Sequence, residues 1–224
     1  MTKTRDKLQV ATTALLILTA LVMAFNSYQV MALKALPTDV TGTVTATSQV
    51  QVLAGSSVIP TGVPAVYGQE LGISYDGVSA ADPRLADQTI GVMAQLDRTI
   101  QLDDAQNERF INILYKMGNG MSCEFCCGAR SVIFENGKPA CGCAHSYAMR
   151  GLTKYLITEH GDEFTDEEIL SEVGKWKVLF FPAQHEAKTK VLEEQGLGTD
   201  YISLTTNQYR GIEQSASGSM VGGC

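Results

Sequence analysis

The chain has 224 residues, a formal net charge of −7, 45% apolar residues and 18% charged residues. This length and composition fit one folded domain with an appendage and argue against a disordered chain. A nucleic-acid-binding protein needs clustered lysine and arginine to contact phosphates, so the acidic balance argues against that class and predicts no nucleic-acid partner.

The N-terminal segment 1–34 predicts a transmembrane helix of the signal-anchor type. Three basic residues lie within the first seven positions, and an uncharged, largely apolar stretch runs from Leu8 to Leu33. About 20 apolar residues are enough to cross a bilayer. The basic residues predict that the N-terminus stays inside the cell membrane and that the rest of the chain lies outside the cytoplasm. A signal peptide cleaved near Ala24 is the competing interpretation, and it leads to the same compartment.

Residues 35–66 predict a stalk between the membrane and the folded domain. They are rich in Thr, Val, Ser and Gly, and Asp39 is the only charged residue among them. The alternation of valine and threonine favours extended structure. A strand pair that associates with neighbouring subunits is the alternative, so we expect that the anchor and the stalk can support self-association.

Residues 67–198 predict a compact, mainly α domain with a small β-hairpin. Apolar spacing and capping signals predict helices over about 83–100, 104–117, 144–160, 165–181 and 182–194. Asp82 followed by Pro83 is a helix start, and Thr165 with Glu168 forms a capping-box pattern. Pro182 is expected to end or kink the fourth helix.

The hairpin is predicted between the second and third helices, over residues 131–139. Its turn contains Asn136-Gly137, a strong hairpin signal. Five of the six cysteines lie on its two sides, and a histidine follows them: Cys123, Cys126 and Cys127 before it, then Cys141, Cys143 and His145 after it. A hairpin would bring both groups to its base, which is the arrangement of a metal knuckle. The domain is therefore expected to be built around a cysteine-rich knuckle.

These six side chains are the candidate metal ligands, because clustered thiolates hold soft metal ions. Zinc would use four ligands, for instance Cys123, Cys126, Cys141 and Cys143. Copper(I) accepts two or three, and a methionine such as Met149 could add to them, although buried methionines more often belong to a core. An iron–sulfur cluster ranks lower, because an exported cluster is exposed to oxidants.

Two other uses of the thiols stay open. Six cysteines in an exported domain would ordinarily be interpreted as disulfides. Pairing inside each group is disfavoured, because Cys126 adjoins Cys127 and one glycine separates Cys141 from Cys143. Pairing across the groups remains feasible, and so does a redox-active dithiol. The start of the third helix beside Cys143 predicts a lowered thiol pKa there.

The remaining sequence offers little catalytic chemistry. His160 and His185 fall near expected helix ends and are interpreted as helix-end or surface residues. No nucleotide-binding, metalloprotease or serine-hydrolase signature is present. These observations favour a binding protein over an enzyme. Residues 199–224 predict a flexible tail, whose terminal Cys224 could cap the metal site or crosslink two subunits.

The segment 122–156 resembles a set of uncharacterised membrane-anchored prokaryotic proteins. The similarity is carried by Cys-Glu-Phe-Cys-Cys-Gly, by Cys-Gly-Cys-Ala-His-Ser and by residues 148–152, and it covers roughly 67–196. It implies a domain boundary and thiols that act as one unit. The expected function is extracytoplasmic binding of zinc or copper for sequestration, transfer or structural bracing. Thiol–disulfide exchange, or a surface module stapled by metal or disulfides, is the alternative.

Overall fold

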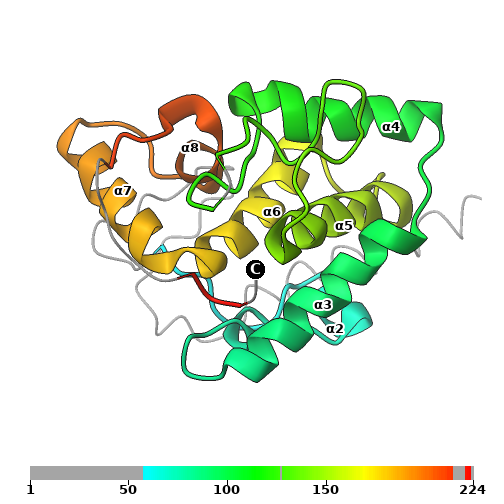
Figure 1. Ribbon diagram of the computed structural model, residues 1–224, viewed down its shortest axis with the longest axis horizontal. Helices are drawn as coiled ribbons and strands as arrows, with labels where there is room; N and C mark the ends of the chain where they lie inside the picture. Colours follow the sequence, from blue (N-terminus) through cyan, green and yellow to red (C-terminus); the bar gives the residue numbers. More distant parts are fainter. Residues whose placement is uncertain (1–57, 127, 214–219, 223–224) are drawn as a thin grey trace, which may run out of the picture. The chain divides into compact units, whose positions relative to one another are not determined.

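The computed structural model describes residues 58–126, 128–213 and 220–222 (Figure 1). The anchor predicted over 1–34 and most of the predicted stalk lie outside these residues. In the part of the chain that is described, no helix combines the length and the apolar character needed to cross a membrane.

The described residues form a mainly helical domain, as predicted, and they contain no β-strand beyond isolated bridges. The α-helices are α2 (Gly68–Leu71), α3 (Pro83–Thr99), α4 (Asp104–Ile111), α5 (Ala144–Glu159), α6 (Asp166–Phe180), α7 (Pro182–Glu194) and α8 (Tyr201–Thr205). Shorter turns are η1 (Tyr75–Gly77), the π-helical η2 (Asn112–Lys116), η3 (Met117–Asn119) and η4 (Asn207–Tyr209).

The helix starts follow the capping signals of the sequence. The Asp82 carboxylate accepts a hydrogen bond of 3.0 Å from the Leu85 amide, with Pro83 in the first turn of α3. At α6, the Thr165 hydroxyl and the Glu168 carboxylate form both halves of a capping box. Pro182 separates α6 from α7. These contacts satisfy amide groups that have no partner within the helix.

The predicted second helix departs from regular α geometry. It begins at α4, continues as the π-helical η2 and ends at Gly118, which has a φ of +55°. A side chain at Gly118 would collide with Thr206, so the glycine lets η3 approach the segment that follows α8. The π-helical turn could not be predicted, because apolar spacing does not distinguish it from a continued α-helix.

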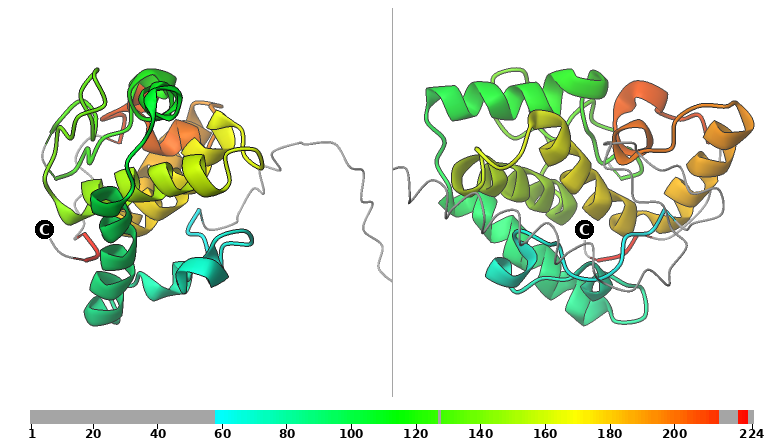
Figure 2. Two further views of the ribbon diagram at one scale, coloured as in Figure 1. Left: turned by 90° about the vertical axis from the view of Figure 1, so that its right-hand side faces the viewer. Right: turned by 180° about the vertical axis from the view of Figure 1, so that it is seen from behind.

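Helices α5 and α6 lie between α4 on one side and α3 on the other (Figures 1 and 2). The approach of α5 to α3 depends on Gly151, where a Cβ atom would overlap the carbonyl oxygen of Met93. The core between the helices includes the largest apolar side chains, all at most 1% exposed: Tyr67, Met93, Phe110, Trp176, Phe180 and Phe181. Met121 and Met149 are also buried there, so both belong to the core.

The β-hairpin prediction is only partly correct. Residues 131–139 make a tight turn with one antiparallel bridge, between Ile133 and Pro139. The Phe134 amide donates to the Lys138 carbonyl at 2.7 Å, and the Ala140 amide donates to Val132 at 3.1 Å. Pro139 has no amide hydrogen to donate, which limits the ladder to a bridge.

The domain continues past residue 198. Residues 199–213, which the sequence analysis assigned to a flexible tail, contain α8 and η4, and α8 packs against α6. Leu204 and Thr205 are fully buried. Gly174 of α6 permits this contact, because a Cβ atom there would lie 2.8 Å from the Thr205 hydroxyl oxygen. Val221, further along the chain, is also buried in the core.

Candidate metal centre

Three of the predicted ligands converge. The sulfur atoms of Cys123, Cys141 and Cys143 all lie within 4.8 Å of one another. Cys143 is 3.4 Å from Cys123 and 3.6 Å from Cys141. A disulfide requires about 2.05 Å, whereas zinc–sulfur bonds of about 2.3 Å in tetrahedral geometry separate two sulfurs by roughly 3.8 Å. The observed separations are therefore close to those of ligands around a single ion.

Different elements bring the three sulfurs together. Cys123 follows η3, and the Cys126 amide donates to its carbonyl at 2.7 Å in a tight turn. The Arg150 guanidinium of α5 donates to the carbonyl oxygens of Cys141, at 2.8 Å, and Val132, at 3.1 Å. Cys143 is the N-cap residue of α5. The turn over 131–139 thus brings both cysteine groups to the same helix end.

Ser146 connects two of the sulfurs. Its amide donates to the Cys143 sulfur at 3.4 Å, and its hydroxyl oxygen lies 3.3 Å from that sulfur and 3.0 Å from the Cys123 sulfur. The hydrogen bond from Cys123 lowers the pKa of Cys143 to about 2, against the opposing effect of burial, with further lowering by His145 and Ser146. The same hydrogen bond, with burial, raises the pKa of Cys123. The two shifts favour a thiolate at Cys143 and a thiol at Cys123, and the lowered pKa of Cys143 is the direction that the helix start predicted.

His145 lies beside the sulfurs but outside the group. Its ring packs against Phe180 and Phe181, with centroids 4.6 and 5.2 Å away, and it is fully buried. Its Nε2 atom lies at hydrogen-bond distance, 2.9 Å, from the carbonyl oxygen of Val221. The side chain also forms a hydrogen bond with Cys143. In this arrangement His145 orients and stabilises a thiolate, which is the role of a residue behind the ligands.

The other predicted ligands are placed differently. Cys126 is exposed and does not belong to the group of three sulfurs. Cys127 and Cys224 lie outside the described residues. The motif Cys-x2-Cys-Cys therefore contributes Cys123 to the group, and Cys-x-Cys contributes both of its cysteines. Sequence spacing predicted that cysteines gather here, but it did not predict which of them form the group of three sulfurs.

A buried charge cluster, which the sequence did not predict, lies next to Cys123. The ammonium groups of Lys177 and Lys188 both lie 3.4 Å from one carboxylate oxygen of Glu124, and neither lysine is exposed. The other carboxylate oxygen of Glu124 accepts from the Gly211 amide at 2.9 Å. A signal was available, because Lys177 occupies the apolar stripe of α6, four residues after Val173.

This cluster carries two basic groups for one acid. Burial lowers the pKa of Lys177 to about 8, although Glu124 opposes the shift. Burial, followed by the charge of Lys177, lowers the pKa of His185, which is therefore neutral. His185 was predicted at a helix end or on the surface, but it is fully buried and packs against Phe125.

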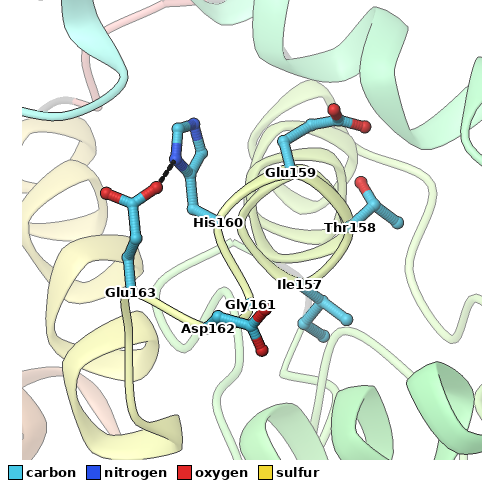
Figure 3. A pocket seen from close by; sticks show the side chains of 7 residues that line it. All are labelled: Ile157, Thr158, Glu159, His160, Gly161, Asp162 and Glu163. Carbon is cyan, nitrogen blue, oxygen red and sulfur yellow. Dashed lines mark hydrogen bonds and ion pairs between the residues drawn. The ribbon is translucent and has the colours of Figure 1, made fainter. Parts of the chain in front are cut away.

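A pocket of about 340 Å³ lies where α5 turns into α6 (Figure 3), lined by Ile157, Thr158, Glu159, His160, Gly161, Asp162 and Glu163. His160 and Glu163 point toward each other, with Nδ1 2.8 Å from the carboxylate. The Nε2 atom lies 3.0 Å from Glu70. Burial alone would lower the pKa of His160, but Glu163 and Glu70 raise it. His160 thus acts as a link between α2 and the end of α5.

Comparisons with protein-family models, with curated proteins and with solved structures found no match. Three close sulfurs, one of them a stabilised thiolate, could hold a metal ion. A thiolate beside a thiol can also exchange disulfides.

Proposed function

We propose that this protein binds a soft metal ion, zinc or copper(I), through Cys123, Cys141 and Cys143. The observation that carries the proposal is the convergence of the three sulfurs within 4.8 Å. Thiolate ligands select soft ions over magnesium or calcium, which prefer oxygen. The predicted N-terminal anchor would hold this domain outside the cytoplasm, at the membrane surface.

The protonation state of the centre supports metal binding. Thiols must lose their protons to become ligands, so a site of three ordinary thiols binds metal only as it releases protons. The pKa of Cys143 is already lowered, by Cys123 and then by His145 and Ser146. The lowered pKa thus favours a negatively charged ligand at Cys143 before an ion arrives.

The exposure of the sulfurs favours sequestration or transfer of the ion over bracing of the fold. Cys123 is buried, whereas Cys141 and Cys143 are half-buried. An incoming ion, or a partner that accepts it, would approach from the side of the less buried Cys-x-Cys segment. The helices also have an extensive apolar core of their own, so the domain has a source of stability other than metal.

Metal analysis of anaerobically purified protein tests this function. We expect about one zinc or copper ion per chain, and its loss in the double variant Cys141→Ser, Cys143→Ser. The matched control is Cys126→Ser, which removes an exposed cysteine of the same motif and should keep the ion. Equal metal content in the double variant and the wild type would contradict the proposal, as would failure of reduced protein to bind added zinc or copper(I).

A thiol–disulfide exchange function is the second candidate, favoured by the 3.4 Å contact between a Cys143 thiolate and Cys123. The half-buried Cys143 sulfur would attack a disulfide of a partner protein and release one partner thiolate. Cys123, after losing its proton, would attack the Cys143 sulfur and release the second. The partner's disulfide is reduced to two thiols, and Cys123 and Cys143 are oxidised to a disulfide.

Two single variants test this second function. With a disulfide-containing model substrate, Cys143→Ser should abolish the reaction, because it removes the attacking group. Cys123→Ser should accumulate a mixed disulfide, because it removes the resolving group. Metal-free protein that shows neither effect, with its cysteines reduced, would rule this function out.

A further inference from the structure

Arg150 of α5 is a fully buried arginine that holds main-chain groups on both sides of the turn over 131–139. Its Nη1 atom donates to the carbonyl oxygen of Val132 at 3.1 Å and to that of Cys141 at 2.8 Å. The Val132 carbonyl also accepts from the Ala140 amide at 3.1 Å. One side chain thus fixes the chain where it leaves the turn and enters the candidate metal centre.

The guanidinium is itself held on several sides. Its Nε atom donates to Asp97 of α3 at 2.8 Å, and the two side chains of this ion pair are 1% and 4% exposed. The other carboxylate oxygen of Asp97 lies 2.8 Å from the Lys154 ammonium. The Tyr147 ring packs against the guanidinium, with 4.6 Å between Cζ and the ring centroid. These contacts fix the plane of the guanidinium and therefore the direction of Nη1.

The reach of Arg150 follows from its place in α5. Side chains of a helix lean toward its N-terminus, and Arg150 lies about two turns after Cys143, the N-cap residue. Its long side chain therefore runs back toward the helix end at which the cysteines gather. A guanidinium donates in several fixed directions, whereas the ammonium group of lysine is a single point of charge. Only arginine can bond Asp97 and both carbonyl groups at once.

Of the three sulfurs, that of Cys141 depends most on this contact. Cys143 is fixed as the N-cap of α5, and Cys123 is buried in the core. Cys141 is half-buried and is joined to Cys143 by Gly142, where a Cβ atom would meet nothing within 4 Å. Neighbouring atoms thus restrain this glycine link little, and glycine is conformationally permissive. The bond from Arg150 supplies a restraint on the Cys141 main chain.

We propose that Arg150, fixed by Asp97, is a positioning residue of the metal centre. It would hold Cys141 where its sulfur can join the other two around an ion. The inference rests on the proposed function and makes it more specific, because it assigns the placement of one ligand to a buried ion pair. Residues behind metal ligands change metal affinity by about 10–100-fold. The positive charge beside Cys141 also favours thiolate ligands.

Competition for zinc between the reduced, metal-free full chain and a chromophoric chelator tests the inference. Arg150→Lys keeps the charge but loses the fork, so it should bind zinc at least about tenfold more weakly. Arg109→Lys is the matched control. The Arg109 guanidinium has the same kind of contacts away from the cysteines: its Nε lies 2.6 Å from Asp166, and its Nη atoms donate to the Gly161 and Phe164 carbonyls. This control should bind zinc as the wild type does.

A second pair of variants leaves both arginines in place. Asp97→Asn has nearly the same shape but removes the charge that fixes Arg150, so zinc affinity should fall in the same direction. Asp166→Asn makes the same change beside Arg109 and should leave zinc affinity unchanged. This pair tests the inference even if Arg150→Lys does not fold, which circular dichroism would show.

Cobalt(II) gives a readout that a merely structural role would not move, because its thiolate charge-transfer absorbance reports the sulfur ligands. In Arg150→Lys this absorbance should fall toward that of Cys141→Ser. Adding Arg150→Lys to Cys141→Ser should weaken cobalt(II) binding no further, because the ligand that Arg150 positions is already absent. Such non-additivity is the sign that two residues act together.

The outcomes separate this inference from the proposed function. Equal zinc affinity in the wild type, Arg150→Lys and Asp97→Asn overturns the inference and leaves metal binding intact. An equal loss of affinity in Arg109→Lys also overturns it, because the effect would then be general. So does a full further loss when Arg150→Lys is added to Cys141→Ser. No zinc, cobalt(II) or copper(I) binding by the wild type overturns both.

Discussion

At the scale of single residues, Ser146 determines much of the chemistry of the centre. Its hydroxyl has one donor and two acceptor sites, and it lies within 3.3 Å of both Cys123 and Cys143. It can therefore donate a hydrogen bond to the Cys143 thiolate, which also accepts one from the Cys123 thiol. This arrangement favours a thiolate at Cys143 and a thiol at Cys123.

Substituting Ser146→Ala should raise the pKa of Cys143, because one of the hydrogen bonds that lower it is lost. The thiolate absorbance of metal-free protein near 240 nm, followed against pH, measures the change. Metal affinity should fall about tenfold, as for other residues that support ligands. Ser203→Ala, which removes a serine bonded to Asp200 instead, is the control. An unchanged titration would show that Ser146 does not stabilise the thiolate.

At the scale of elements, the crossing of α3 and α5 depends on a glycine. We expect Gly151→Ala to destabilise the domain by about 3 kcal/mol, because its Cβ atom would overlap the Met93 carbonyl and a packed backbone yields little. Gly91→Ala, in α3, has no atom within 4 Å of the new methyl group. It should stabilise the domain by about 0.5–1 kcal/mol. Urea unfolding measures the change in unfolding free energy for each variant. Equal changes would contradict the close approach of α3 and α5 at Gly151.

The buried charges between α6, α7 and the Cys123 loop give a second prediction at this scale. Glu124→Gln leaves Lys177 and Lys188 without a counter-charge and should lower the free energy of unfolding by about 3–5 kcal/mol. Lys177→Met leaves one lysine for one carboxylate, so it should lower the free energy of unfolding less. Urea unfolding at neutral pH measures both free energies. If Lys177→Met lowers the unfolding free energy more than Glu124→Gln does, the 2.6 Å hydrogen bond from Lys177 to the Thr205 carbonyl contributes more to stability than the charge balance.

The lowered pKa of Lys177, about 8, also predicts a pH dependence. An unfolded lysine has a pKa near 10.4, so between about pH 8 and 10.4 the unfolded chain binds more protons at this residue. Stability then rises with pH in that window. The Lys177→Met variant lacks this contribution. The difference in unfolding free energy between the wild type and this variant should therefore change with pH only between about pH 8 and 10.4. A constant difference would place Lys177 outside the buried cluster.

The helices could be predicted from the sequence because their signals are local. Asp82 with Pro83, Thr165 with Glu168, and Pro182 each act within a single turn. Helix α8 could not be predicted, because five residues are too few for an apolar period to show. Its burial depends on Gly174 of α6, a contact between distant parts of the chain.

The site was predictable to a similar extent. Cysteine spacing indicated that thiols gather, and the start of α5 indicated a lowered pKa at Cys143. Which thiols come together depends on the path of the chain. The sequence alone therefore could not show that Cys123 joins the group and Cys126 does not. The position of His145 depends on Val221, which lies 76 residues away. Contacts at that separation leave no trace in local spacing.

At the scale of the whole molecule, metal binding should raise the stability of the domain by mass action. The centre joins the loop after η3 to the start of α5, and these parts separate on unfolding. An ion that binds only the folded chain adds about 2.7 kcal/mol when its concentration is 100 times Kd. For a domain of this size that corresponds to a rise in Tm of roughly 5–10 °C.

Thermal unfolding of reduced protein, with zinc or with a chelator, measures this rise. The Cys141→Ser, Cys143→Ser variant should show no difference between the two conditions, while its Tm with the chelator should stay near that of the metal-free wild type. We expect this unchanged Tm because neither Cys141 nor Cys143 is fully buried in the apolar core. If instead the chelator alone unfolds the wild type, the ion is part of the fold, and bracing replaces sequestration or transfer as the role of the centre.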